Sequence, residues 1–338
     1  MREHAGLLAY QGAEADQLGF LLRPIQEYLA ASFVVTHPKP EEIGGELATM
    51  FHAEPEDQGE VVRLAVKRSA GNAAFRTALV GGLLEGGLDG NDDVFLGRLV
   101  SMAREEAVPA FVEASAKEGD RWRKGRLLGF VRKFRTPELR ELAKTLQDHP
   151  ETKWHALEIL AEPSKTPPEK GDLWVEQETG MCFMRVKAGS FRMGSETGGS
   201  DEKPVHEVRI SKDYWLGKCS VSNGEYGIYL EAKRKEKEKL DDPLFWGDPR
   251  FNGEYQPGVG VSWDDAKAFC EWLREKSGAE IFLPTEAEWE YGCRAGSETK
   301  YCFGDLEKDL KDYAWFGQDY WNGRTQVAGV MKPNGWGL

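Results

Sequence analysis

The feature that most constrains this chain is a pair of helix starts in the stretch Val259–Gly304. Ser262 is followed three positions later by Asp265, and Thr285 is followed in the same way by Glu288. In each pair the hydroxyl can accept a hydrogen bond from a first-turn backbone N–H, and the carboxylate can accept one from the N–H of the hydroxyl-bearing residue. The sequence therefore predicts one helix after Ser262 and another after Thr285.

The residues around these starts define the helices further. An apolar stripe at helical spacing follows Ser262 and comprises Ala266, Phe269, Cys270 and Leu273. We expect Gly278 and Gly296 to end the two helices, because glycine adopts the left-handed conformation of a helix end without strain. Ser222 with Glu225 makes a third capping box, ahead of a helix that contains Tyr226, Tyr229 and Leu230.

Short strands and large aromatic side chains characterise the second half of the chain. The segment 183–193 alternates as two short strands around an Ala-Gly-Ser turn, and the segment 205–210 alternates again. Tryptophan is concentrated there, at Trp215, Trp246, Trp263, Trp272, Trp289, Trp315, Trp321 and Trp336. Because aromatic side chains bury a large area where regular structure is sparse, we predict an aromatic core among short strands and few helices.

The first half has helical periodicity. Apolar residues recur at three- and four-residue spacing from Met1 to about Ala161, for example at Ile25, Tyr28 and Leu29, at Leu127, Leu128 and Val131, and at Leu139, Leu142 and Leu146. Successive helices of this kind favour a stacked array. Three prolines then interrupt the pattern, at Pro163, Pro167 and Pro168. The predicted class is α+β, with an all-α, solenoid-like array over 1–161, a Pro-rich linker over 162–172 and a domain of short strands over 173–338.

Several separated motifs of this second domain closely resemble the domain shared by formylglycine-generating enzymes and sulfatase-modifying factors. The motifs occur in the family's order and are MCFMRVKAGSFRMGS, DEKPVHEVRISKDYWLGKCSVSNGEY, LPTEAEWEYGCRAGSETKYCFGD, DYAWF and KPNGWGL. The resemblance covers about residues 175–338. It implies a C-type-lectin-like fold with much irregular structure.

The resemblance also implies a reaction that this chain is expected to lack. Enzymes of the family oxidise a cysteine in a Cys-x-Pro-x-Arg target with molecular oxygen, using copper held by two active-site cysteines. Thiolates suit cuprous ion because both are soft. In the family those cysteines follow an Asn-Gly-x-Trp-Glu-Trp motif, and this chain stops at KPNGWGL, before it. We therefore expect a truncated domain without the oxidase site, and we assign no catalytic, cofactor-binding or metal-binding residue.

Structural calcium is a second property that the resemblance implies. Family members bind it partly through Asn and Asp side chains near a Tyr-Ala-Asn stretch, and hard Ca²⁺ prefers such oxygen ligands. Here Trp315 replaces that Asn, Tyr320 stands near the expected Asp, and Asp319 is one position away. Carbonyl groups of Trp315 and Phe316 would remain as ligands. We expect neither calcium nor copper to be a cofactor of this chain.

The five cysteines, Cys182, Cys219, Cys270, Cys293 and Cys302, form no Cys-x-x-Cys pair and have no His at metal-ligand spacing. The sequence therefore predicts reduced, mostly buried thiols. Cys270 and Cys293 lie on the two capped helices and are expected to be packing residues. Cys302 is expected in a short strand or turn where it can be exposed.

Histidines and acidic residues supply no clear catalytic group. His206 lacks a second His or Cys at ligand spacing, so we predict a hydrogen-bonded histidine at a strand end. Asp201 and Glu202 are expected to be solvated residues of a turn. Iron-dependent sulfoxide synthases of the same fold use a His-x-x-x-His-x-Glu site. That spacing is not found among His4, His37, His52, His149 and His155.

A shorter resemblance occurs at residues 18–34. This segment is similar to a helical element that follows the nucleotide-binding core of NACHT-type signalling NTPases, with matches at Phe20, Gln26, Glu27, Tyr28, Leu29, Ala30 and Ala31. Arg23 departs from the pattern, and an amphipathic helix alone can produce such a motif. No GxxxxGK[ST] sequence occurs in the chain, so we expect no ATP hydrolysis by it.

Composition limits the partners. The net charge of −13 and the isoelectric point near 5.1 argue against nucleic acid, which needs clustered cations. The sequence has neither an apolar run of about 18 residues nor a signal-peptide pattern at its start, so we expect a cytoplasmic protein without membrane association. A protein or peptide ligand is the expected partner.

Two functions compete on this evidence. The first is an oxidase of the formylglycine-generating type, of which this chain carries the part before the copper ligands. The second is a non-catalytic, lectin-like module for binding or display in a NACHT-like signalling or defence protein, and fold alone does not choose between them. We also expect poor solubility for residues 171–338 alone, because strand edges and aromatic surface would be exposed.

Overall fold

The computed structural model describes residues 39–53, 62, 64–67, 69, 72–85, 93–237, 240–317 and 323–338. The chain divides into two compact units between Glu118 and Gly119. The mixed α+β class is confirmed, with a helical region followed by a region of short strands. None of the described helices is long and apolar enough to cross a membrane. Segment 18–34, which resembles the NACHT-associated element, lies outside the described residues.

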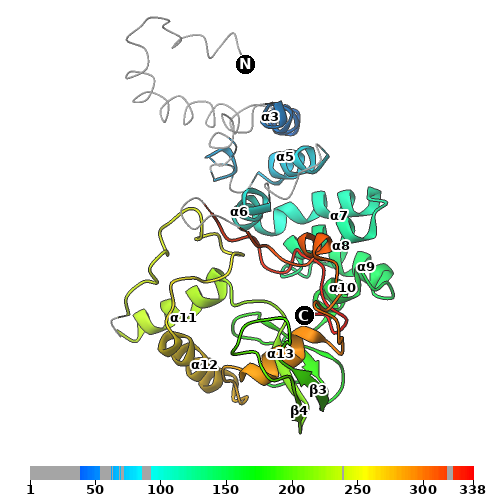
Figure 1. Ribbon diagram of the computed structural model, residues 1–338. Coiled ribbons are helices and arrows are strands. Elements are labelled where there is room, and N and C mark those ends of the chain that lie inside the picture. Colours follow the sequence, from blue (N-terminus) through cyan, green and yellow to red (C-terminus); the bar gives the residue numbers. More distant parts are fainter. Residues whose placement is uncertain are drawn as a thin grey trace, which may run out of the picture. The chain divides into compact units, whose positions relative to one another are not determined.

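Helices make up the described part of the first unit (Figure 1). They are α3 (Pro40–Ala53), α5 (Ala73–Glu85), α6 (Asp93–Ala103), the 3₁₀ helix η2 (Arg104–Ala107) and α7 (Val108–Lys117). Helices α3 and α5 approach closely through glycine, because a Cβ at Gly44 would lie 2.8 Å from the carbonyl oxygen of Phe75. Arg76 is buried and bonds Ser69 Oγ at 3.0 Å and Glu106 at 2.7 Å. This unit therefore has a core of its own.

Three further helices, α8 (Arg121–Val131), α9 (Pro137–Leu146) and α10 (Lys153–Leu160), belong to the second unit. Asp120 caps α8 by accepting from the N–H of Arg123, and Thr136 caps α9 by accepting from the N–H of Leu139. The predicted limits, 1–161 for the helical array and 162–172 for the linker, place these helices before the boundary. Packing instead groups them with residues 161–338, so the compact unit begins well before the predicted linker.

The predicted linker is itself attached to the second unit. The N–H of Ser164 donates to the carbonyl of Val175 at 2.9 Å, and Nε1 of Trp174 donates to the carbonyl of Ser164 at 3.0 Å. The indole of Trp174 is 2% exposed. Residues 161–172 thus contain no helix, as the prolines predict, but they are hydrogen-bonded to the first strand that follows.

Two small antiparallel sheets follow. One has the order β1-β2-β5, from β1 (Leu173–Val175), β2 (Cys182–Val186) and β5 (Tyr214–Gly217), and the other pairs β3 (Gly189–Met193) with β4 (His206–Ile210). In the first sheet Phe183 lies opposite Trp174 and Gly217. The predicted strands of segments 183–193 and 205–210 are confirmed as β2, β3 and β4, whereas β1 and β5 were not predicted.

An aromatic core lies between the first sheet and two helices, α11 (Asn223–Lys235) and α12 (Trp263–Ser277). Its buried members are Trp174, Met181, Phe183, Tyr226, Tyr229, Leu230, Phe269, Trp272, Leu273 and Ala279. The ring of Phe269 contacts Tyr226, Tyr229 and Trp272 with centroids between 5.6 and 5.9 Å apart. The prediction of an aromatic core is confirmed for these residues. It is wrong for Trp263 and Trp289, which are 65% and 59% exposed.

All three capping boxes are present. They begin α11 at Ser222, α12 at Ser262 and α13 (Glu286–Arg294) at Thr285. Helix α12 ends as predicted at Gly278, with φ of 75°. Helix α13 ends one residue earlier than predicted, because Ala295 takes the left-handed C-cap conformation and Gly296 follows it with φ of 82°. A 3₁₀ helix, η3 (Glu307–Asp312), and irregular chain complete the unit.

A buried group of charges joins the helices α8–α10 to the first sheet. Arg132, at the end of α8, donates from Nε to Oε1 of Glu158 in α10 at 2.7 Å. Lys218, directly after β5, donates from Nζ to Oε2 of the same carboxylate at 2.7 Å. The side chains are 8%, 2% and 5% exposed for Arg132, Glu158 and Lys218. We call these three residues the charge triad.

Replacing Glu158 with Gln should lower the free energy of unfolding of the full chain by about 3–5 kcal/mol, because two buried cations lose their shared carboxylate. The matched control is Glu162→Gln, since Glu162 is 77% exposed and pairs with Arg140 at the surface. The control should cost less than about 1 kcal/mol. Urea unfolding of both variants measures this, and equal loss in both would show that the charge triad does not hold the unit together.

Candidate functional site

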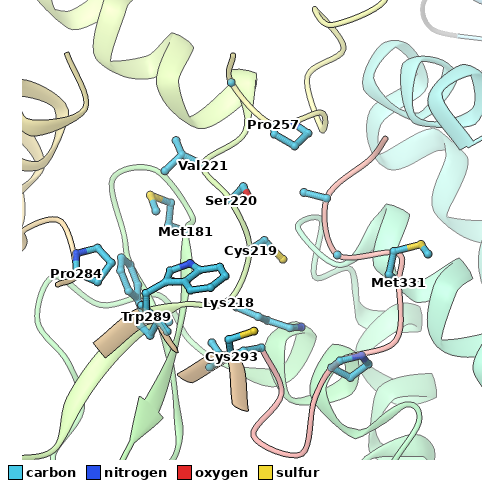
Figure 2. A pocket seen from close by; sticks show the side chains of 18 of the residues that line it. Met181, Lys218, Cys219, Ser220, Val221, Pro257, Pro284, Trp289, Cys293 and Met331 are labelled. Carbon is cyan, nitrogen blue, oxygen red and sulfur yellow. The ribbon is translucent and has the colours of Figure 1, made fainter. Parts of the chain in front are cut away.

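The second unit contains a cavity of about 1020 Å³. Its walls come from the end of the first sheet, from helices α10, α12 and α13, and from the segment 325–338 (Figure 2). The lining is mostly apolar and includes Met181, Phe183, Phe269, Leu273, Ile281 and Leu283. Pockets of this size and character are the usual places for small ligands.

Two aromatic side chains of the lining are open to solvent. Phe282 is 61% exposed and Trp289 is 59% exposed, although both belong to the cavity wall. Trp289 lies near the start of α13, where Thr285 accepts from the N–H of Glu288 and Oε2 of Glu288 accepts from the N–H of Thr285 at 2.9 Å. Figure 2 shows the indole between Pro284 and Cys293. Exposed aromatic surface beside an apolar cavity marks a binding site.

Charged groups of the lining are paired or neutral. Lys218 is paired with Glu158 in the charge triad, and Lys332 is paired with Asp312 at 2.9 Å. Burial alone would raise the pKa of Glu158, but Lys218 and Arg132 outweigh it and hold this pKa well below its usual range. Glu158 is therefore ionised throughout the neutral range.

His155 of α10 also lines the cavity and is buried. Its Nδ1 has no hydrogen-bond partner among the described residues. Burial lowers the pKa of His155 well below its usual range, and the positive charge of Lys218 lowers it further. The imidazole is therefore neutral at pH 7, so it adds no charge to the cavity.

Four of the five cysteines, Cys219, Cys270, Cys293 and Cys302, line this cavity. Burial raises the pKa of each of these thiols, and for Cys302 the neighbouring Cys293 raises it further. None is in a disulfide. Cys270 packs against the aromatic core as predicted. Cys293 does not, because its side chain is exposed, and Cys302 is half-buried.

This donor set does not fit a copper site of the kind that the resemblance implies. Cuprous ion binds thiolates, so it would have to displace a proton from each of these thiols, and none of the five cysteines occupies a copper-ligand position of the family that the chain resembles. The remaining cysteine, Cys182, lies beside the charge triad, and burial raises its pKa well above the usual range. We therefore derive no reaction step through copper for the cysteines of this chain.

The calcium site that the resemblance implies lies partly outside the described residues. Ca²⁺ takes about six to eight oxygen ligands, and the described residues contain no group of three or more His, Cys, Asp or Glu that could hold a metal. Asp319 and Tyr320 lie outside the described residues. Trp315, which replaces the family's Asn, uses its Nε1 to donate to the carbonyl of Arg324 at 2.8 Å.

The other candidates from the sequence lie away from the cavity. His206 is exposed at the start of β4, with Nδ1 3.0 Å from the carbonyl of Pro204, so the predicted hydrogen-bonded histidine at a strand end is confirmed. Asp201 and Glu202 are exposed in a turn, where Glu202 accepts from the N–H of Gly199 at 2.8 Å. The predicted turn role is confirmed for Glu202.

The sequence interpretation missed the charge triad and His155. A local signal existed for Glu158, because this acidic residue sits within the apolar run Ala-Leu-Glu-Ile-Leu of α10. A carboxylate in such a position must find a partner, since an unpaired buried charge is very costly. Nothing in the sequence indicated that the partners would be Arg132 and Lys218, because they lie in separate segments.

Neutral, buried His155 should make stability depend on pH. Its folded pKa is lowered, so the stability it contributes is present above the unfolded pKa near 6.5 and is lost as pH falls below it. The free energy of unfolding should fall by about 1.4 kcal/mol per pH unit below about pH 6 from this group.

Urea unfolding of the full chain between pH 5 and 7.5 measures that slope. The variant His155→Gln should lose this part of the slope, whereas His206→Gln, changed at an exposed strand end, should keep it. Identical slopes in wild type and His155→Gln would contradict a buried neutral imidazole.

Comparison with known proteins identifies the region that holds the cavity. Residues 173–338 match a family model described as a sulfatase-modifying factor enzyme 1-like domain. A formylglycine-generating enzyme from Mycobacterium tuberculosis is 27% identical over 211 residues, which cover 45% of this chain and 68% of that protein. The serine/threonine-protein kinase pkn1 of Chlamydia pneumoniae is 31% identical over 167 residues, covering 45% of this chain.

This chain spans about a quarter, 25%, of the length of that kinase. Among solved structures, PvdO from Pseudomonas aeruginosa is 29% identical, with 51% of this chain and 71% of that chain covered and a TM-score of 0.43.

Proposed function

Because residues 173–338 form a domain of the sulfatase-modifying factor family, we propose that this chain uses that domain to bind an apolar ligand and not to oxidise a cysteine. The observation that carries the proposal is the cavity of about 1020 Å³, with its mostly apolar lining and its open aromatic side chains. An occupant would remove Phe282 and Trp289 from water, and burial of apolar surface is the main source of binding energy for such a ligand.

The competing function is formylglycine generation, the activity named for the relative from Mycobacterium tuberculosis. It needs a pair of cysteine thiolates that can hold copper, and none of the five cysteines here occupies a copper-ligand position of the family that the chain resembles. The relative from Chlamydia pneumoniae is named as a kinase, so similarity to this domain is not restricted to proteins named as formylglycine-generating enzymes. Binding is therefore the function that fits these residues better.

Our proposal also covers the fold type of the domain, the helical array before it, the cellular context and the partner. We infer that the family domain is C-type-lectin-like and that the helices before it continue as a solenoid-like array. A NACHT-like signalling or defence context rests on segment 18–34 alone. A cytoplasmic location and a protein or peptide partner likewise stay predictions from the sequence.

Binding of the neutral fluorescent dye Nile red tests the cavity. Wild-type protein should bind it saturably, and Trp289→Ala should weaken binding by about tenfold, because the dye loses an aromatic wall. Trp263→Ala is the matched control, since Trp263 is 65% exposed and does not line the cavity. This control should change the dissociation constant by less than about twofold. Equal effects of the two variants would contradict binding in the cavity.

A second test addresses the competing function. With copper, oxygen and a Cys-x-Pro-x-Arg peptide, the chain should yield no aldehyde above the uncatalysed rate, because none of its five cysteines occupies a copper-ligand position of the family that it resembles. Mass spectrometry of the peptide detects the product, and the Mycobacterium tuberculosis enzyme serves as positive control. Turnover of the peptide by this chain would show that the oxidase reading is right.

A further inference from the structure

The end of the cavity at Lys218 carries an excess of positive charge. In the charge triad two cations, Arg132 and Lys218, share the single carboxylate of Glu158. The nearby pair of Lys133 with Glu225, at 3.0 Å, adds no net charge. One positive charge is therefore left uncompensated in a region where all three triad side chains are less than a tenth exposed. Such a charge is costly unless an anion accompanies it.

Lys218 also has unused hydrogen-bonding capacity. Its ammonium group carries three N–H donors, and the described residues supply one acceptor to it, Oε2 of Glu158 at 2.7 Å. The side chain is 5% exposed, so bulk water does not take the other two donors freely. Buried donors of this kind normally have a partner. An oxygen acceptor beside Lys218 would satisfy them.

The structure has room for such an acceptor. A small cavity of about 20 Å³ adjoins the charge triad and is also lined by Lys133 and Glu225. Met181, Lys218 and Cys219 line both this small cavity and the large apolar one, so the two adjoin. Figure 2 shows Lys218 beside Cys219 at this part of the wall. The combined space has a long apolar part and one small, positively charged end.

We propose that the cavity binds an apolar molecule with a single carboxylate group, of the fatty-acid type, whose carboxylate is held by Lys218. This inference rests on the proposed function and names its ligand class. One negative charge matches the one uncompensated positive charge of the triad. A phosphate group would bring about two negative charges at neutral pH and so would exceed the one uncompensated positive charge. The apolar chain would lie against Phe269, Leu273 and Trp289 in the large cavity.

The test compares two ligands of equal chain length, decanoate and 1-decanol, by isothermal titration calorimetry with the full chain. Wild type should bind decanoate about tenfold more tightly than decanol, because only the carboxylate gains charge-assisted hydrogen bonds from Lys218. Lys218→Met should reduce this preference to less than about twofold. Methionine keeps a linear side chain, and Arg132 still compensates Glu158, so this variant should fold.

Lys332→Met is the matched control, because Lys332 also lines the cavity and its charge is paired with Asp312 at 2.9 Å. It should keep the preference for decanoate. Equal binding of the two ligands to wild type, or an unchanged preference in Lys218→Met, would overturn the carboxylate assignment while leaving the apolar cavity as a binding site. Failure of both ligands to bind wild type would overturn the proposed function as well.

Discussion

The ion pairs that Glu158 makes with Arg132 and Lys218 are the contacts on which the second unit depends. They join three separate segments, the end of α8, the middle of α10 and the residue after β5. A buried ion pair adds little net stability compared with apolar packing. Loss of Glu158 is nevertheless costly, because it leaves Arg132 and Lys218 without a carboxylate in a low-dielectric interior. The charge triad therefore contributes more to the choice of one arrangement of these segments than to the net free energy of unfolding.

The same contacts shape the cavity. Helix α10 supplies Trp154 and His155 to the cavity wall, while Glu158 of the same helix holds Lys218 on the facing side. Arg132 adds a hydrogen bond from Nη2 to the carbonyl of Ala328 at 3.4 Å, and Ala328 also lines the cavity. Helix α10, which precedes the matched region 173–338, thus supplies part of the cavity wall.

How much of this follows from the sequence depends on the distance over which each interaction acts. The capping boxes at Ser262 and Thr285 were predictable because their partners are three residues apart and are fixed by local geometry. The number of aromatic residues predicted that an aromatic core exists, but it did not predict which of them are buried. Trp272 is buried, whereas Trp289 on the next helix is exposed to solvent. The spacing of apolar residues predicts which face of a helix is apolar, but not which other element packs against that face.

The charge triad could not be derived in this way. Glu158 is separated from Arg132 by 26 positions and from Lys218 by 60. The strands β1 and β5 were missed for a related reason, because they have three and four residues and too little alternation for a pattern.

The early start of the compact unit has an evolutionary consequence. Recombination at residue 173 would exchange Lys218 without Glu158, whereas a crossover upstream of Gly119 would transfer Lys218 together with the carboxylate that pairs with it.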